Sequence, residues 1–344
     1  MNTTVFFATN RIRSGDGTKL IDYAGEAGPA GLPGKLTHAT AFITGTDAVG
    51  LKTGQVNSIQ EVTDGAFFKD VAADLAGKDN LLIFLHGFAN GFGDALTRSA
   101  FNREWFAPAG TVAAFSWPSG GVLIDGKTIL PGLFVAPLSL LLLAAGQVQS
   151  PLATAYRADQ AAAFASAGDA MSFLDRLRPI SAALRKKGGR VILMAHSMGN
   201  HVLRGALEKW SAMGLPQDIL FDEAIIAAAD TDYAEGQSGP AWLQHLGEVS
   251  ERVSVYFSAK DSILLLSRGV NGMKRLGDSG PIDMNVSGRY PISRFRFVDC
   301  SRLKDTGPEP SLDMSHQYYR RIPEVRDDIR RVINGTGQAG LVAL

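Results

Sequence analysis

The chain has 344 residues, of which 45% are hydrophobic and 20% are charged, with 34 Lys and Arg against 34 Asp and Glu. This is an ordinary globular composition, long enough to bury a full core and unlike that of a disordered chain. The zero formal net charge argues against a nucleic-acid partner, because such proteins usually carry a basic excess.

The cysteine count and the apolar stretches give no sign of export or membrane insertion. Cys300 is the single cysteine, which excludes an internal disulfide and is compatible with the cytosol. The first seven residues lack a basic region and are too short an apolar run for a signal peptide. The longest apolar stretch, 133–146, has 14 residues, whereas a membrane span needs about 18. We therefore expect a soluble, cytoplasmic protein.

Strand-like and helix-like patterns alternate along the chain without an internal repeat or a dividing linker. Strands are predicted over 4–11, 38–45, 80–88, 111–118, 190–197, 223–230, 252–261 and 294–301. Helices are predicted over 67–75, 94–106, 157–187, 198–210 and 323–334, and a glycine-rich loop over 14–36. This alternation predicts an α/β fold in one domain, 1–344, with a mainly parallel central sheet and helices on both faces.

Residues 120–154 interrupt this alternation. They are apolar at the centre (LFVAPLSLLLLAAG) and longer than a direct connection between a strand and a helix needs. The segment is either a cap or lid over the site or a packing element elsewhere. We favour the cap, because loops after strand carboxyl ends surround the ligand crevice in such sheets. Docking of this stretch on a lipid surface is not favoured, because it carries no basic residues.

A candidate nucleophile lies in Ala195-His196-Ser197-Met198-Gly199, between a predicted buried strand and a predicted helix. This is the G-x-S-x-G pattern with alanine in the first small position. The tight turn strains the serine, exposes its Oγ, and leaves the Met198 N–H at a helix N-terminus. The alternative is that Ser197 only caps the following helix.

The earlier strand ends in His86-Gly87-Phe88, where a second oxyanion donor is expected. The Phe88 N–H is our candidate, to act together with the Met198 N–H; the alternative is a simple glycine turn. Asn90 would either bind substrate or stabilise this loop. The residues that we expect to line the substrate site are His86, Gly87, Asn90 and Trp117.

A serine nucleophile needs a histidine base, and the motif's chain order is Ser, then Asp or Glu, then His. Of six histidines, His316 fits, because it follows the last long strand and precedes the last helix. Its alternative is a histidine at a helix start. Asp261 is the leading candidate for the acid, with Asp230 and Asp232 as alternatives, and each of the three would otherwise be a helix cap.

With these motifs the chain resembles bacterial α/β hydrolases, particularly a poorly characterised group of predicted esterases. The matching segments are VFFATNR, LIFLHGFAN, FSWPSGG, AHSMGNHVL, AIIAAADTD, VYFSAKDSIL and MSHQYYRRIP. The resemblance covers 4–11 and most of 80–330, and it implies a triad of Ser197, Asp261 and His316 with an oxyanion donor in the 86–88 loop. The insert at 120–154 departs from the family by its length.

The function expected from these motifs is hydrolysis of a carboxylic ester with an apolar acyl or alcohol part, through an acyl-enzyme. A thioesterase, amidase or acyltransferase would use the same triad, and a non-catalytic binding protein would keep the fold alone. We expect no cofactor and no metal, because His196 and His201 lack a His-Glu-x-x-His spacing and no glycine-rich phosphate loop is present. The oligomeric state is not indicated.

Overall fold

The computed structural model describes residues 1–23, 32–45, 54–120, 151–216, 218–284, 288–303, 305 and 315–344. Most of the insert predicted over 120–154 lies outside the described residues. Of that range, only Gly120 and the first turn of helix α4, from Pro151, are described. The assignment of this segment as a cap or lid therefore stays a prediction.

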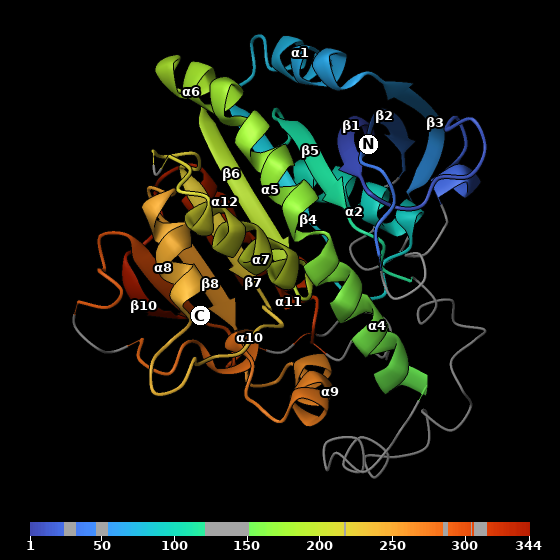
Figure 1. Ribbon diagram of the computed structural model, residues 1–344. Helices are drawn as coiled ribbons and strands as arrows, with labels where there is room; N and C mark the ends of the chain where they lie inside the picture. Colours follow the sequence, from blue (N-terminus) through green and yellow to red (C-terminus); the bar gives the residue numbers. More distant parts are fainter. Residues whose placement is uncertain are drawn as a thin grey trace.

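All described strands belong to one ten-stranded sheet in the order β10-β9-β8-β7-β6-β4-β5-β1-β2-β3 (Figure 1). Strand β2 runs antiparallel to its two neighbours, and the other neighbouring pairs are parallel. The strands are β1 (Asn2–Thr9), β2 (Thr37–Thr44), β3 (Gln55–Val62), β4 (Asn80–Leu85), β5 (Thr111–Ser116), β6 (Arg190–His196), β7 (Glu223–Ala227), β8 (Val253–Phe257), β9 (Phe295–Asp299) and β10 (Gly340–Ala343).

The central strands are buried on both faces, as their continuous apolar sequences predict. In β4, Leu81 and Ile83 pack into one hydrophobic core, whereas Leu82 and Phe84 pack into a second core on the opposite face. Successive side chains of a strand point to opposite faces, so the single run NLLIFL supplies both cores.

Helices cover both faces. One face is covered by α1 (Asp64–Asp74), α4 (Pro151–Ala165), α5 (Ala167–Arg176), α6 (Arg178–Lys186), α7 (Gly199–Ala212) and α8 (Ala241–Glu248) (Figure 1). The other face is covered by α2 (Phe92–Phe106), α11 (Tyr318–Arg321) and α12 (Pro323–Ile333). The remaining helices among the described residues are the short 3-10 helix η1 (Leu20–Tyr23), α9 (Ser262–Asn271) and α10 (Leu276–Ser279).

Helices α9 to α11 were not predicted, and two further aspects of the sequence prediction are wrong in detail. The single helix predicted over 157–187 consists of three helices, α4 to α6, which begin at Pro151 and are joined at Ser166 and Leu177. Both junction residues keep right-handed helical dihedral angles, so the helical spacing of apolar residues continues through them. Strands β3 and β10 were not predicted, because these edge strands carry few buried side chains.

The strand order makes the carboxyl ends of β4 and β6 a topological switch point, the place where sheets of this kind have their ligand crevice. Strand β5 follows β4 on one side, and the chain then returns to place β6 on the other side of β4. The helices that follow the two strands, α2 and α7, lie on opposite faces of the sheet. Ligands bind outside the carboxyl ends of the strands at such a point.

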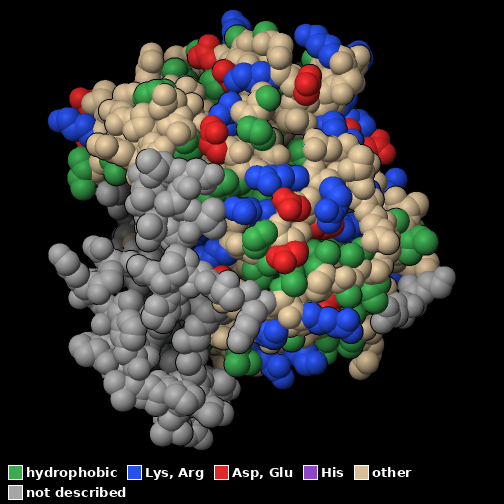
Figure 2. Space-filling view, turned by 180° about the vertical axis from the view of Figure 1, so that it is seen from behind, with side chains coloured by type: hydrophobic (Ala, Val, Ile, Leu, Met, Phe, Trp, Pro, Cys, Tyr) green, Lys and Arg blue, Asp and Glu red, His purple; other side chains and the backbone are tan. Residues whose placement is uncertain are grey.

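The surface agrees with the neutral composition. Figure 2 shows acidic and basic side chains interspersed on the face seen from behind. In the part of the chain that the structure describes, no helix combines the length and the apolar character that a membrane crossing requires.

Candidate active site

Ser197 occupies a strained turn between β6 and α7. Its φ is +55°, a left-handed conformation that is unfavourable for a residue with a Cβ. The turn is held by the Ser197 N–H, which donates to the Ala227 carbonyl at 3.0 Å, and by the Ser197 carbonyl, which accepts from the Asp230 N–H at 3.2 Å. These bonds fix the strained serine to the loop that follows the neighbouring strand β7.

Two glycines allow the backbone to approach this turn closely. A Cβ on Gly199 would lie 2.5 Å from the Leu85 carbonyl oxygen, so no other residue fits there. A Cβ on Gly87 would lie 2.7 Å from the Ser197 Cβ, which brings the loop after β4 directly against the serine. The glycines predicted to be needed at the two strand ends therefore have a steric reason.

His316 pairs with Asp261. The Nδ1 of His316 lies 2.8 Å from Oδ2 and 3.0 Å from Oδ1 of Asp261, and both residues are buried. Asp261 follows β8 and is also the N-cap of α9, where its side chain accepts from the Leu264 N–H at 3.1 Å. The carboxylate thus orients the imidazole and starts a helix at the same time.

The two alternative acids have a different partner. Arg275 donates from Nε to Oδ1 of Asp230 at 3.1 Å, and its Nη1 pairs with Asp232. Tyr156 donates its hydroxyl to Oδ2 of Asp230 at 2.8 Å, and Ser267 donates to Oδ1. Of the three candidate aspartates, Asp261 is the one for which the structure gives a bond to His316.

His196 connects the base to the serine turn. Its Nε2 lies 3.1 Å from the His316 carbonyl oxygen, and the two ring centroids are 4.7 Å apart. Burial lowers the pKa of His196 well below its usual value, so the ring is neutral, and its Nε2–H donates to the His316 carbonyl. His316 is therefore fixed against the residue that precedes Ser197. Sequence reasoning did not find this contact.

The two predicted oxyanion donors have no hydrogen-bond partner within the described residues. Neither the Phe88 N–H nor the Met198 N–H donates to another group there. The side-chain Nδ2 of Asn90 donates to the Gly87 carbonyl at 2.8 Å and to the Phe88 carbonyl at 2.9 Å. Because a trans peptide directs its C=O and N–H to opposite sides, the bond to Gly87 turns the Phe88 N–H away from Asn90.

His86 and Trp117 lie beneath this loop. Their rings stack at 5.2 Å, and the Trp117 Nε1–H donates to the His86 carbonyl at 2.8 Å. Both side chains are buried, and burial lowers the pKa of His86 to about 3, so this ring is neutral. Its Nδ1 lies 3.0 Å from the Gly87 carbonyl oxygen, which gives that carbonyl a second donor.

Sequence reasoning missed two buried charged residues close to this loop, Arg11 and Asp159. Arg11 follows β1 and donates to the Asn90 carbonyl at 2.9 Å, whereas Asp159 lies on α4 and accepts from the Ala89 N–H at 3.3 Å. For Arg11 the available signal was a charged residue directly after a buried strand, in the segment TNR. The sequence carried no such signal for Asp159, because an aspartate on a helix is normally solvated.

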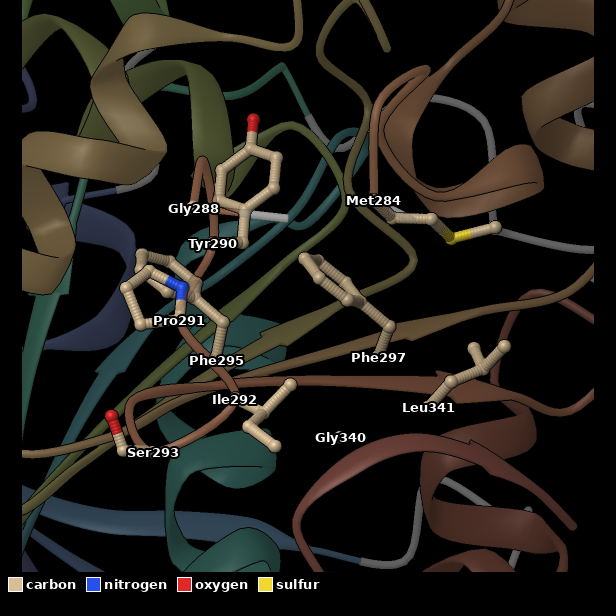
Figure 3. A pocket seen from close by; sticks show the side chains of 10 residues that line it. All are labelled: Met284, Gly288, Tyr290, Pro291, Ile292, Ser293, Phe295, Phe297, Gly340 and Leu341. Carbon is tan, nitrogen blue, oxygen red and sulfur yellow. The ribbon is translucent and has the colours of Figure 1, made fainter. Parts of the chain in front are cut away.

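An apolar pocket of about 570 Å³ lies elsewhere, at the β9–β10 edge of the sheet. Figure 3 shows Tyr290, Phe295, Phe297 and Leu341 around it. Strands β7 and β8 separate this edge from β6, and none of the predicted site residues lines the pocket. The switch point at the carboxyl ends of β4 and β6, where the predicted site residues lie, is therefore the better candidate for the substrate site. Among the described residues, no group of three or more His, Cys, Asp or Glu is placed to hold a metal ion.

A mainly parallel sheet with a strained serine in the turn from a central strand to the following helix defines an α/β hydrolase. The chain matches, over residues 64–334, the family described as alpha/beta hydrolase of unknown function (DUF900), and it belongs to this family. The fold class and the resemblance predicted from the sequence are thereby confirmed, and the membership supports a hydrolase. The search of curated proteins found no match to the chain.

Proposed function

We propose that the chain is a serine hydrolase that cleaves carboxylic esters, with Ser197 as nucleophile, His316 as base and Asp261 as the orienting acid. The observation that carries the proposal is the His316–Asp261 pair, because His316 is also bonded to the residue preceding the strained Ser197. A histidine held by a carboxylate beside a strained serine is the arrangement that activates a hydroxyl for attack.

In the proposed reaction, the Ser197 Oγ attacks the ester carbonyl carbon, and His316 takes the hydroxyl proton. The carbonyl oxygen becomes negative and accepts hydrogen bonds from the Phe88 and Met198 N–H groups, which have no other acceptor in the described part of the chain. His316 then gives its proton to the departing alcohol, which leaves an acyl-enzyme. Water attacks the acyl-enzyme, its proton passes through His316 back to Ser197, and the carboxylic acid is released.

The imidazolium that forms twice in this cycle needs a negative partner, and the Asp261 carboxylate supplies it. Thioesters, amides and acyl transfer to another acceptor would use the same groups. Esters are favoured because they are the least demanding acyl substrates. The alternative from a different functional class is a binding protein that keeps this fold and has lost catalysis.

The test is hydrolysis of p-nitrophenyl esters with short to long acyl chains. We expect turnover by the wild type and a loss on the order of 10⁶-fold in kcat for Ser197→Ala. The matched control is Ser250→Ala, because Ser250 is also a fully buried serine but follows α8, away from the crevice. Its kcat should equal that of the wild type.

A fluorophosphonate probe gives a second readout that does not depend on the substrate. Ser197 Oγ should form a bond to phosphorus as fluoride leaves, and mass spectrometry should find the adduct on this residue. If the wild type hydrolyses none of the esters and is not phosphonylated, the chain is not a serine hydrolase. Labelling without ester turnover would instead shift the proposal to amide or thioester substrates.

A further inference from the structure

The loop after β4 adopts a strained conformation at Ala89. Its φ is +54°, in the left-handed region that favours glycine, although the residue is alanine and is buried. Such a conformation persists only where the surroundings impose it. Phe88, whose N–H is the proposed oxyanion donor, is the residue directly before Ala89.

Asp159 holds one side of this loop. Its Oδ2 accepts from the Ala89 N–H at 3.3 Å and from the Ser119 hydroxyl, and its Oδ1 accepts from the Gly120 N–H at 2.9 Å. The Ser119 Oγ in turn accepts from the Asn90 N–H at 3.2 Å. The carboxylate therefore acts directly on Ala89, and through Ser119 on Asn90.

Arg11 holds the other side. Its Nη2 donates to the Asn90 carbonyl at 2.9 Å, its Nη1 to the Ser119 carbonyl at 3.0 Å, and its Nε to the Ser116 hydroxyl oxygen at 3.2 Å. Arg11 is 1% exposed and Asp159 is 6% exposed, so both groups act where water does not weaken their hydrogen bonds. The planar guanidinium reaches three acceptors at fixed angles, which a lysine ammonium cannot do.

We propose that Arg11 and Asp159 are positioning residues for the oxyanion loop. They hold the Ala89–Asn90 segment in its strained conformation, so that the Asn90 side chain fixes the Gly87 carbonyl and directs the Phe88 N–H toward the substrate oxygen. This inference rests on the proposed function. It adds that the oxyanion site is maintained by two buried side chains of opposite charge, Arg11 after β1 and Asp159 on α4.

The test compares Asp159→Asn and Arg11→Lys with the wild type. In Asp159→Asn, an amide NH₂ replaces one acceptor oxygen and faces donors, so the loop should relax. For both variants we expect kcat to fall by about 10²-fold, the scale of losing one oxyanion donor, with KM changed less than about threefold. The affinity for a trifluoromethyl ketone analogue of the same ester, which binds as a tetrahedral oxyanion, should fall by the same factor as kcat.

The matched control is Asp328→Asn. Asp328 is also a buried aspartate that accepts a hydrogen bond from a hydroxyl, that of Tyr256, and it pairs in addition with the buried Arg296. It lies on α12, outside the site. Its kcat should stay at the wild-type value. If Asp159→Asn does not fold, Ser119→Ala takes its place. This variant removes a single hydroxyl from the network, and its kcat should fall by about tenfold.

The inference is wrong if the Asp159 and Ser119 variants keep wild-type kcat, or if kcat and analogue affinity do not fall together. The rate of phosphonylation of Ser197 reports on the same loop without an ester, because the phosphonyl oxygen occupies the oxyanion site. If the wild type turns over esters and the variants match Asp328→Asn, only the positioning role fails. If Ser197 of the wild type is not phosphonylated, the proposed function fails as well.

Discussion

Asp230 and Asp261 look alike in sequence but have different environments in the structure. Each follows one of two adjacent parallel strands, β7 and β8, at the same edge of the sheet, and each is 2% exposed. Asp230 accepts hydrogen bonds from Arg275, Tyr156 and Ser267, whereas Asp261 pairs with His316. The strand end brings a carboxylate to the crevice, and the residues that later segments bring to it distinguish the two.

The difference follows from charge compensation. A buried carboxylate needs a positive partner or several donors, and Arg275 gives Asp230 a permanent charge. His316 gives Asp261 a partner that gains and loses a proton within the proposed reaction. We infer that Asp230 stabilises the fold and that Asp261 serves the chemistry.

The largest effect should come from Asp261→Asn. The amide would hold His316 in the wrong tautomer, so we expect kcat for ester hydrolysis to fall by about 10⁴-fold. Asparagine is also a good N-cap, so α9 should remain intact and the urea unfolding midpoint should change little. A variant with wild-type kcat would remove Asp261 from the triad.

Asp230→Asn should give the opposite pattern. Arg275 is 1% exposed and would lose its buried partner, although Asp232 still pairs with it. We expect the free energy of unfolding in urea to fall by about 3 kcal/mol, the low end for breaking a buried ion pair. The control is Asp327→Asn, which breaks the exposed ion pair between Asp327 and Arg330. It should change the free energy of unfolding by less than about 0.5 kcal/mol. If Asp230→Asn lost kcat by 10⁴-fold without a loss of stability, Asp230 rather than Asp261 would be the acid that orients the histidine.

The smallest effect concerns His201, which lies close to the Asp230 network on α7. Burial lowers the pKa of His201 to about 4, so the unfolded state, with a pKa near 6.5, binds the proton more tightly. Stability is therefore complete above pH 6.5 and is lost as the pH falls toward 4. Between pH 6.5 and 5 the loss should be about 2 kcal/mol for this group.

Urea unfolding at both pH values checks this expectation. His201→Gln cannot titrate, so its free energy of unfolding should fall by about 2 kcal/mol less than that of the wild type over the same interval. Equal losses in the two proteins would mean that His201 is not held neutral in the folded state.

The sequence predicted the parts of the fold that depend on local pattern. Continuous apolar runs such as NLLIFL gave the central strands, and the glycines near Ser197 gave the turn. The edge strands β3 and β10 were missed because their pairing comes from neighbouring strands rather than from their own burial. The breaks at Ser166 and Leu177 were missed because both residues keep helical angles.

The candidate site also contains residues that the sequence predicted and residues that it did not. Ser197, Asp261 and His316 follow from a motif, a strand end and a chain order, and all three are buried. Arg11, Asp159 and His196 could not be assigned, because their contacts join segments far apart in sequence. Arg11 is 79 residues from Asn90, and Asp159 is 70 residues from Ala89.

The bond between His196 and the His316 carbonyl spans 120 residues, and the contact between His316 and Asp261 spans 55. These contacts are as non-local as the sheet itself, since the pairing of β4 with β6 brings Asn80 to Arg190, far along the chain. Turnover during refolding should therefore not return before the sheet has paired, which far-UV circular dichroism follows. The proposed enzyme would thus report by its own activity whether a molecule has completed its fold.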